Sequence, residues 1–281
     1  MRSLALSWEL RHWRRAGRTA RLWWRDDDAA ARTARLDRLL LMAWASEAPL
    51  TLAVVPAGDM AGLRSLLELR LATETGRITI AQHGVDHQNR CSGPAAGEFP
   101  HSWSRDEVAT ALRRGWSLIQ DLPRAEPVFV PPWNDVHPEL SAALGACGYQ
   151  GWSGSGDLAE AGRAPVGALR RLDVHLDLLR WRGGARFRGK DVFLKNLTRE
   201  LRRRREAGLW SAPIGLLTHH LAHDEASWAF LERFLAWTNA SAQFRWAALP
   251  DLISETSGEA EAVDRATAPA WRPARPAAVL N

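Results

Sequence analysis

The sequence is poor in cysteine and has no long apolar run. Cys91 and Cys147 are too few for a disulfide framework, and neither has a second cysteine nearby to form a metal knuckle. No apolar stretch approaches the roughly 18 residues that a membrane-spanning helix needs. The arginine-rich first 24 residues hold no uninterrupted apolar segment and no small-residue cleavage site, so no export signal is expected. We therefore expect a soluble, cytoplasmic protein without a membrane partner.

Lysine is also scarce, because Lys190 and Lys195 are the only two and all other cationic side chains apart from histidine are arginines. Such a bias more often reflects GC-rich codons than a binding surface. The four arginines at 202–205 fall in a predicted helix, where consecutive residues face different directions. We interpret this run as a solvated helix end and expect no nucleic-acid partner; an arginine-rich nucleic-acid binder would show a steep salt dependence.

Two catalytic motifs are absent as well. The chain has no Gly-x-Ser-x-Gly elbow, which disfavours a serine hydrolase, and no glycine-rich motif that would cradle a phosphate. The composition, with 46% hydrophobic and 25% charged residues, is that of an ordinary globular protein.

Strand-like and helix-like segments alternate along the chain, which is typical of parallel strands joined by crossover helices. Seven or eight such units would close a barrel of the α/β class. The predicted strands are 22–24, 50–55, 78–81, 128–130, 150–152, 172–176, 214–217 and 244–249, and the predicted helices are 30–47, 59–75, 104–121, 138–147, 191–208 and 225–238. Residues 1–253 are expected to form one domain, followed by an Ala/Pro/Arg-rich tail at 254–281 that is predicted to be disordered.

Three of the predicted strands are followed directly by carboxylates or imidazoles. Asp26, Asp27 and Asp28 follow 22–24, His83 and His87 follow 78–81, and a cluster of histidines at 219, 220 and 223 follows 214–217. Because the carboxyl ends of parallel strands meet at one end of a barrel, a shared site is expected there. Two histidines and a carboxylate with an open position form a catalytic rather than a structural ligand set for a divalent metal, most typically zinc.

The three motifs differ in how strongly each indicates a functional site. His83 and His87 are four residues apart, so a helical turn would point both rings the same way, and Gly84 allows a sharp turn after the strand. Capping of the next helix would explain one of the three adjacent aspartates but not all of them, because three carboxylates repel one another without a cation. His219 or His220 could act as a general acid, while His223 could be a surface residue near a helix start.

In this order, the motifs resemble those of the polysaccharide deacetylase (NodB-homology) family over roughly residues 20–250. The resemblance implies a distorted (β/α) barrel that removes acetyl groups from amino sugars with a divalent metal. It implies that Asp27 is the catalytic base, that Asp28, His83 and His87 hold the metal, and that His219 in Leu217-Thr218-His219 is the general acid. This register is the one of a divergent subgroup of the family, which has an arginine two positions before the aspartate pair, here Arg25. The competing register, with Asp26 as the base and Asp27 as the ligand, stays open.

The middle of the chain departs from the family pattern. Where the family has an arginine before a proline and an aromatic residue, this chain has Phe129 to Asn134 with no arginine, so the group that would orient the base is missing. Trp133 and Trp152 could form an apolar wall for a sugar. Further candidates near the substrate or behind the site are Asp26, Asn134, Asp177 and His220; Asp173, His175 and Trp181 could also belong to the family's aspartate-and-tryptophan motif.

The resulting hypothesis is a metal-dependent hydrolase that removes an acetyl or similar acyl group from an N-acylated sugar. One alternative is an amide or imide hydrolase of a small cytoplasmic metabolite, which the expected lack of export favours. Another is a non-catalytic member of the fold that binds a carbohydrate or a partner, which the presence of base, ligands and acid disfavours. The partner is thus expected to be a small-molecule or saccharide substrate, and no sequence feature indicates an oligomeric state.

Overall fold

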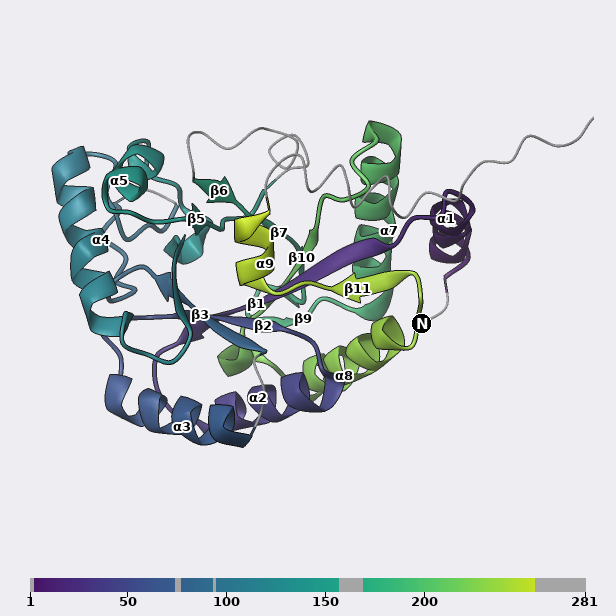
Figure 1. Ribbon diagram of the computed structural model, residues 1–281, viewed down its shortest axis with the longest axis horizontal. Helices are drawn as coiled ribbons and strands as arrows, with labels where there is room; N and C mark the ends of the chain where they lie inside the picture. Colours follow the sequence, from purple (N-terminus) through teal and green to yellow (C-terminus); the bar gives the residue numbers. More distant parts are fainter. Residues whose placement is uncertain (1–2, 74–76, 93–94, 157–168, 256–281) are drawn as a thin grey trace, which may run out of the picture.

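The computed structural model describes residues 3–73, 77–92, 95–156 and 169–255 (Figure 1). Its main sheet has nine strands in the order β6-β5-β4-β3-β2-β1-β10-β7, with β11 added beside β1, and the pairings are parallel. The strands are β1 (Ala20–Ala29), β2 (Leu50–Val54), β3 (Ile78–His83), β4 (Ala125–Val130), β5 (Gly151–Trp152), β6 (Arg170–Arg171), β7 (Val174–Asp177), β10 (Ile214–Thr218) and β11 (Phe244–Trp246).

The sheet curls into a half-barrel whose two end strands, β6 and β7, are separated by only two residues of the chain. β6 pairs with β5, whereas β7 pairs with β10 at the other end of the strand order. Just beyond β5, Ser155 forms a parallel bridge with Val174, and the Val174 amide donates a hydrogen bond to the carbonyl of Gly154 at 3.0 Å. The predicted α/β fold, a distorted (β/α) barrel, is confirmed.

Helices surround the sheet, with α2, α3 and α8 along one side of it (Figure 1). A short antiparallel hairpin of β8 and β9 and an N-terminal helix, α1, were not predicted. The helices are α1 (Leu4–Arg15), α2 (Ala34–Ser46), α3 (Met60–Thr73), α4 (Arg105–Ile119), α5 (Leu140–Ala146), α7 (Lys190–Ala207), α8 (Glu225–Asn239) and α9 (Leu249–Ser254), with single 3-10 turns η1 (Pro132–Asn134) and η2 (His220–Ala222); the hairpin strands are β8 (Leu179–Arg180) and β9 (Arg186–Phe187).

Side-chain alternation along β1 divides the core in two. Leu22 and Trp24 join the large cluster that packs the sheet against the helices, whereas Trp23 joins a smaller cluster with Ala53, Ala81 and the α9 leucines. Successive strand residues point to opposite faces. It follows that Arg25 and Asp27, which share the parity of Trp23, belong to the inner face of the barrel, and Asp26 to the outer one.

Two predicted boundaries are wrong for local reasons. The helix predicted to begin at residue 30 begins at Ala34, because the Thr33 hydroxyl caps it by accepting the Leu36 amide at 3.0 Å. None of the three aspartates caps this helix. The strand predicted at 244–249 ends at Trp246, and Leu249 already belongs to α9. The capping box of Ser104 and Glu107, by contrast, is present at the start of α4.

The arginine run is not simply a solvated helix end, so that prediction needs correction. The side chain of Arg204 is fully buried and donates to the carbonyls of Ala212 and Pro213 and to the carboxylate of Glu200 at 2.7–2.9 Å. Arg205 forms an ion pair at 2.6 Å with the buried Glu9 of α1. Arg204 therefore attaches α7 to the segment before β10, and Arg205 attaches α7 to α1, so neither contributes to a basic surface.

Part of the predicted tail lies outside the described residues. Ser254 ends α9, and the Glu255 carboxylate forms an ion pair with the guanidinium of Arg21. Residues 256–281 are not described. In the described part of the chain, no helix is both long enough and apolar enough to cross a membrane.

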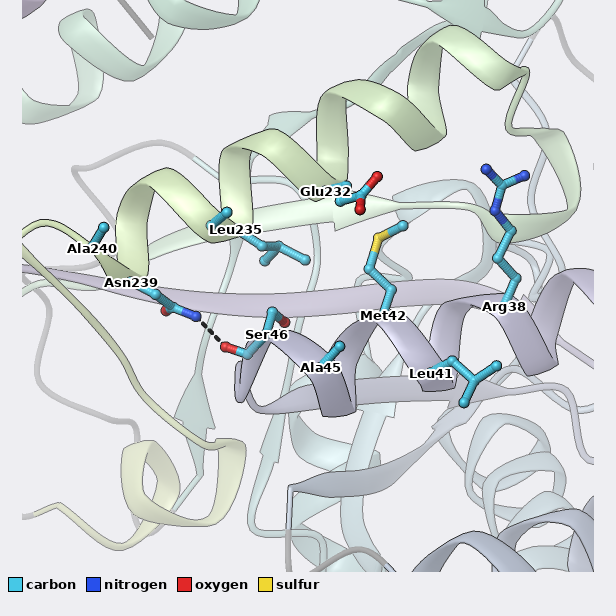
Figure 2. Close-up of a pocket in the computed structure, with 10 residues that line it drawn as sticks. Arg38, Leu41, Met42, Ala45, Ser46, Glu232, Leu235, Asn239 and Ala240 are labelled. Atoms are coloured by element: carbon cyan, nitrogen blue, oxygen red, sulfur yellow. Dashed lines mark hydrogen bonds between the residues drawn. The ribbon is translucent and has the colours of Figure 1, made fainter.

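A surface cavity of about 750 Å³ lies between the outer helices α2 and α8 (Figure 2). Alongside apolar side chains it is bordered by Arg38 and Glu232, and the Asn239 amide donates to the carbonyl of Ser46 across it. The residues around it hold no histidine or cysteine and no paired carboxylates. It therefore offers no chemistry that would compete with the site at the strand ends.

Candidate metal and acid-base site

The carboxylate Asp28 and the imidazoles of His83 and His87 meet at the ends of β1 and β3. One ligand atom from each lies within 4.8 Å of the others, and the Nε2 atoms of both histidines are 3.2 Å from Asp28 Oδ1. The Asp28 and His87 side chains are 33% and 25% exposed, so small molecules can reach the cluster, while His83 is buried. Two imidazoles and one carboxylate with an exposed side form a set typical of catalytic zinc.

The ring of His83 is oriented for ligation. Its Nδ1 atom lies 3.0 Å from the carbonyl of Val130, and a carbonyl accepts only from a protonated nitrogen. The Nε2 atom faces Asp28 at 3.2 Å, and in the neutral ring it would be the nitrogen available to a metal ion. Such a backbone partner for the second ring nitrogen is what fixes metal-binding histidines in proteins. The donor set therefore fits a divalent ion.

Electrostatics within the cluster also favour a cation. Burial opposes ionisation of Asp28, but hydrogen bonds with His83 and His87 outweigh it and hold the pKa of this carboxyl far below its ordinary value. Burial likewise disfavours charge on His83, yet Asp28 and Asp27 raise the pKa of its imidazole. Positive charge is thus stabilised at this point, as a bound metal ion would require.

A β-bulge decides where the adjacent aspartates point. In the pairing of β1 with β2, Asp26 lies opposite Leu52 and Ala29 opposite Val54, so β1 holds one extra residue there. Asp28 takes up the irregularity with a φ of 71°. Bulges re-aim side chains next to active sites, and this one turns Asp28 toward the histidines while Asp27 stays on the inner face.

Asp27 is buried and held by Arg25. The Arg25 Nε atom is 2.8 Å from Asp27 Oδ1 and its Nη2 is 2.9 Å from Oδ2, a two-point ion pair with 0% and 3% of the side chains exposed. The guanidinium also donates to the Oδ1 of Asn134 at 2.9 Å and to the hydroxyl of Ser153 at 2.7 Å. A charged group is stable in a protein interior only when it is paired and hydrogen-bonded in this way. The Asp27 carboxylate is thus held in one orientation by a cation from its own strand.

His219 stands across from Asp27 at the end of β10. Its Nε2 atom is 3.9 Å from Asp27 Oδ2, and its ring meets the edge of Trp181 with centroids 4.6 Å apart. The Trp181 indole in turn donates to Asp177 at 2.8 Å. Burial raises the pKa of Asp177 above its usual value, and His219 and Arg188 counteract this shift. Asp177 and Trp181 therefore belong to the site.

Asp26 and His220 form a separate buried pair on the outer face. His220 Nδ1 is 2.5 Å from Asp26 Oδ1, and the Asp26 carboxylate also accepts from the Thr218 hydroxyl at 2.6 Å. Burial alone would raise the pKa of Asp26, but His220 and Thr218 lower it below the usual value. His223 is buried against Trp228, not on the surface as the sequence allowed, and burial lowers the pKa of its imidazole to about 4. None of these groups faces the metal cluster.

The predicted tryptophan wall is half wrong. Trp133 is 42% exposed, and its ring lies 4.3 Å from that of His87, as a wall residue would. Trp152 is 5% exposed and packs in the core, with the Arg171 guanidinium over its ring. Trp181, at 47% exposed, stands instead on the His219 side. The two exposed rings thus lie beside different site histidines, Trp133 beside His87 and Trp181 beside His219.

Two other candidates lie away from the site. Asp173 is buried and accepts from the Gly154 amide and from Arg171. His175 accepts from the Gly215 amide and contacts Arg204 at 3.2 Å. Both stabilise β7 and its neighbours rather than contribute to the cluster.

Backbone strain is concentrated at the cluster. Asp28, His87, Trp133 and Asn134 all have positive φ angles, and they make up four of the six such non-glycine residues in the described part of the chain. Each such residue costs on the order of 1–3 kcal/mol and persists only where its surroundings enforce it. The sheet and its loops therefore hold these side chains in place at the expense of stability.

Comparison with known proteins agrees with this geometry at the level of fold. No protein-family model and no curated protein sequence matches the chain. A protein from Mycobacterium smegmatis assigned as a polysaccharide deacetylase superposes with a TM-score of 0.61 at 18% identity, covering 92% of this chain and 95% of that one. The chain has the polysaccharide deacetylase fold.

Two further structures share the fold. A family 4 carbohydrate esterase from Streptomyces lividans, in complex with acetate, gives a TM-score of 0.52 at 12% identity over 83% of this chain and 94% of that one. A family 4 acetyl xylan esterase from Clostridium thermocellum, in complex with a cobalt ion, gives 0.52 at 12% identity over 83% and 90%. At such low identity the likeness is one of architecture, and the chemistry has to be argued from the residues of this chain.

Proposed function

We propose that this protein is a metal-dependent hydrolase that removes an acetyl or similar acyl group from an N-acylated sugar. The observation that carries the proposal is the meeting of three groups at one barrel end: the Asp28, His83 and His87 cluster, the buried Asp27, and His219. A carboxylate base, a metal ligand set and an imidazole acid are the parts that hydrolysis of an amide needs. The fold shared with a carbohydrate esterase in complex with acetate supports acetyl as the acyl group.

Each residue then has a role that its position supports. Asp28, His83 and His87 would hold a divalent ion, for which zinc is the first candidate, and when bound the ion would polarise the acyl carbonyl and make an attacking water more acidic. Asp27, which Arg25 holds in place, would accept a proton from that water as the water oxygen adds to the carbonyl carbon.

His219 would complete the reaction from the other side of the substrate. Its imidazole would donate a proton to the sugar nitrogen as the carbon–nitrogen bond breaks, releasing acetate and the free amine. The exposed rings of Trp133 and Trp181 would border the sugar, because aromatic faces pack well on the apolar face of a pyranose. The partner is therefore a saccharide substrate.

The test is metal content together with acetate release. Protein purified without a histidine tag or chelators is expected to contain about one divalent ion per chain. The protein is then expected to release acetate from N-acetylated amino-sugar oligomers such as penta-N-acetylchitopentaose, and this release should stop when the ion is removed with a chelator. Absence of a bound ion even after incubation with zinc or cobalt would contradict the proposal.

Arg25 provides a further prediction. Arg25→Lys keeps the positive charge but cannot reach both oxygens of Asp27 and the Asn134 amide at once, so the base loses its fixed orientation. We expect kcat to fall roughly 10- to 100-fold, as is usual when a residue that orients an active-site group is replaced, with metal content unchanged. Steady-state kinetics and elemental analysis measure the two quantities.

The matched control for this variant is Arg171→Lys. Arg171 also forms an ion pair with a buried aspartate, Asp173, but away from the cluster. Its replacement should leave kcat close to that of the wild type. Equal losses in both variants would mean that Arg25 acts only on the stability of the barrel.

A further inference from the structure

The segment that joins the two histidine ligands is not the helical turn that their spacing predicts. His83 is the last residue of β3, and residues 84–87 form no helix. Gly84 and His87 instead adopt positive φ angles of 61° and 55°. The two imidazoles therefore do not converge through helical periodicity, and some other contact has to fix this segment.

Two carbonyls of the segment are held, with Gly84 O accepting from Gln82 Nε2 at 2.9 Å and Val85 O from the Ala57 amide at 2.8 Å. The amides of Val85 and Asp86 are held by the side chain of Glu98, which is 3% exposed. Its Oε1 atom accepts the backbone amides of Val85 and Asp86, both at 2.9 Å, and its Oε2 accepts the Val85 amide at 3.1 Å. These are two of the three residues between the ligands. A single carboxylate thus takes the place of the backbone carbonyls that would accept these amides in a helix.

The glycine between the ligands makes room for this carboxylate. A Cβ atom at position 84 would lie only 1.8 Å from Glu98 Oε2 and 2.5 Å from Pro132 Cγ. Within the described part of the chain, the cation that pairs with Glu98 is Arg90, at 3.6 Å, and Arg90 also donates hydrogen bonds to both carboxylate oxygens of Asp86. A buried carboxylate is costly, so its presence at this place calls for a role.

His87 depends on this segment more than His83 does. The His83 ring is oriented by the Val130 carbonyl, whereas the only polar contact that the described residues give the His87 ring is with Asp28. Trp133 lies beside the His87 ring but gives it no hydrogen bond. The position of the His87 ring is therefore set chiefly by the backbone of its segment. His87 directly follows Asp86, whose amide Glu98 accepts.

We propose that Glu98 is a positioning residue for the metal site, which fixes the 83–87 segment so that His87 faces Asp28 and His83. The inference rests on the proposed function, because it assumes that these three residues bind a metal. Glu98 does not itself contact the cluster. It acts through two backbone amides, so its effect should appear in the affinity for the metal and in the geometry around it.

The experiment is a titration of metal-free protein with cobalt(II), followed by the visible absorption bands of the bound ion. These bands report both the affinity and the coordination geometry. The variants are Glu98→Ala, which removes the acceptor, and Glu98→Gln, whose amide oxygen can still accept the Val85 or Asp86 amide. Glu107→Ala is the matched control, since Glu107 also bonds to backbone but caps α4 away from the site. Thermal melts of the metal-free proteins accompany each titration.

We expect Glu98→Ala to bind cobalt roughly 10- to 100-fold more weakly with an altered spectrum, and Glu98→Gln to recover part of the affinity. Glu107→Ala should lower the melting temperature but leave the cobalt affinity unchanged. Wild-type affinity and spectrum in both Glu98 variants would overturn the inference. If Glu98→Ala does not fold, Glu98→Gln decides in the same way: weaker binding supports the role and unchanged binding rejects it.

The outcome for the wild-type protein separates this inference from the proposed function. A wild-type chain that takes up no cobalt would contradict the proposed metal site, and the role of Glu98 with it. A wild-type chain that binds cobalt while the Glu98 variants bind it equally well would reject only the role of Glu98.

Discussion

Replacing His87 with alanine is expected to abolish metal binding and hydrolysis together. The variant loses one of the three ligands that lie within 4.8 Å of one another, and Asp28 loses one of the two groups that stabilise its negative charge. The affinity should fall by more than the roughly 100-fold that changes behind a metal site typically cause. Because His87 is partly exposed and lies at the barrel mouth, the fold should tolerate the change.

The measurement is zinc or cobalt affinity by titration, paired with acetate release under saturating metal. His101→Ala is the matched control, since His101 is also an exposed histidine but belongs to no metal cluster among the described residues. It should bind metal and hydrolyse substrate as the wild type does. Full metal binding in a His83→Ala, His87→Ala double variant would reject the assignment of the ligands.

Asp27→Asn and His219→Ala are expected to separate chemistry from metal binding. Neither residue belongs to the ligand cluster, so metal content should stay near that of the wild type. Turnover should fall by roughly 10²- to 10⁴-fold in each, the usual contribution of a positioned acid or base. The effect should lie in kcat rather than in KM, because proton transfer occurs in the transition state.

Asp27→Asn needs a stability check, because it leaves the buried Arg25 without its carboxylate partner. Breaking a buried ion pair typically costs about 3–5 kcal/mol. Thermal unfolding of the variant shows whether lost turnover reflects chemistry or loss of the fold. If His219→Ala kept wild-type turnover on a substrate that the wild type hydrolyses, His219 would not be the acid and the proposed mechanism would fail.

Most of the strands that carry the site could be predicted because the sequence repeats the same local pattern. Apolar runs at 22–24, 78–81 and 214–217 each lead into polar side chains, and parallel strands bring such ends together. Their meeting at one barrel mouth follows from topology alone. The N-terminal helix and the β8–β9 hairpin were missed, the latter because its strands are only two residues long.

Arg25 carried a signal in the sequence, because an arginine two residues before the aspartate pair favours the register with Asp27 as the base. Alternation along a strand also places the side chains of Arg25 and Asp27 on one face. The ion pair by which Arg25 holds the Asp27 carboxylate was not predicted. Trp181 was a candidate through the family's aspartate-and-tryptophan motif, but its exposure was not predicted, because exposure cannot be read from the spacing of fifteen tryptophans.

The sequence by itself determined the class of fold, the strand ends that converge, and the residue types available there for metal and acid-base chemistry. Only the tertiary structure decided how those residues point. The bulge in β1, where β1 holds one residue more than the paired part of β2, turns Asp28 toward the histidines. Glu98 holds the His83–His87 segment from a loop more than ten residues away. Both depend on contacts between segments that are distant in sequence, and local pattern carries no information about such contacts.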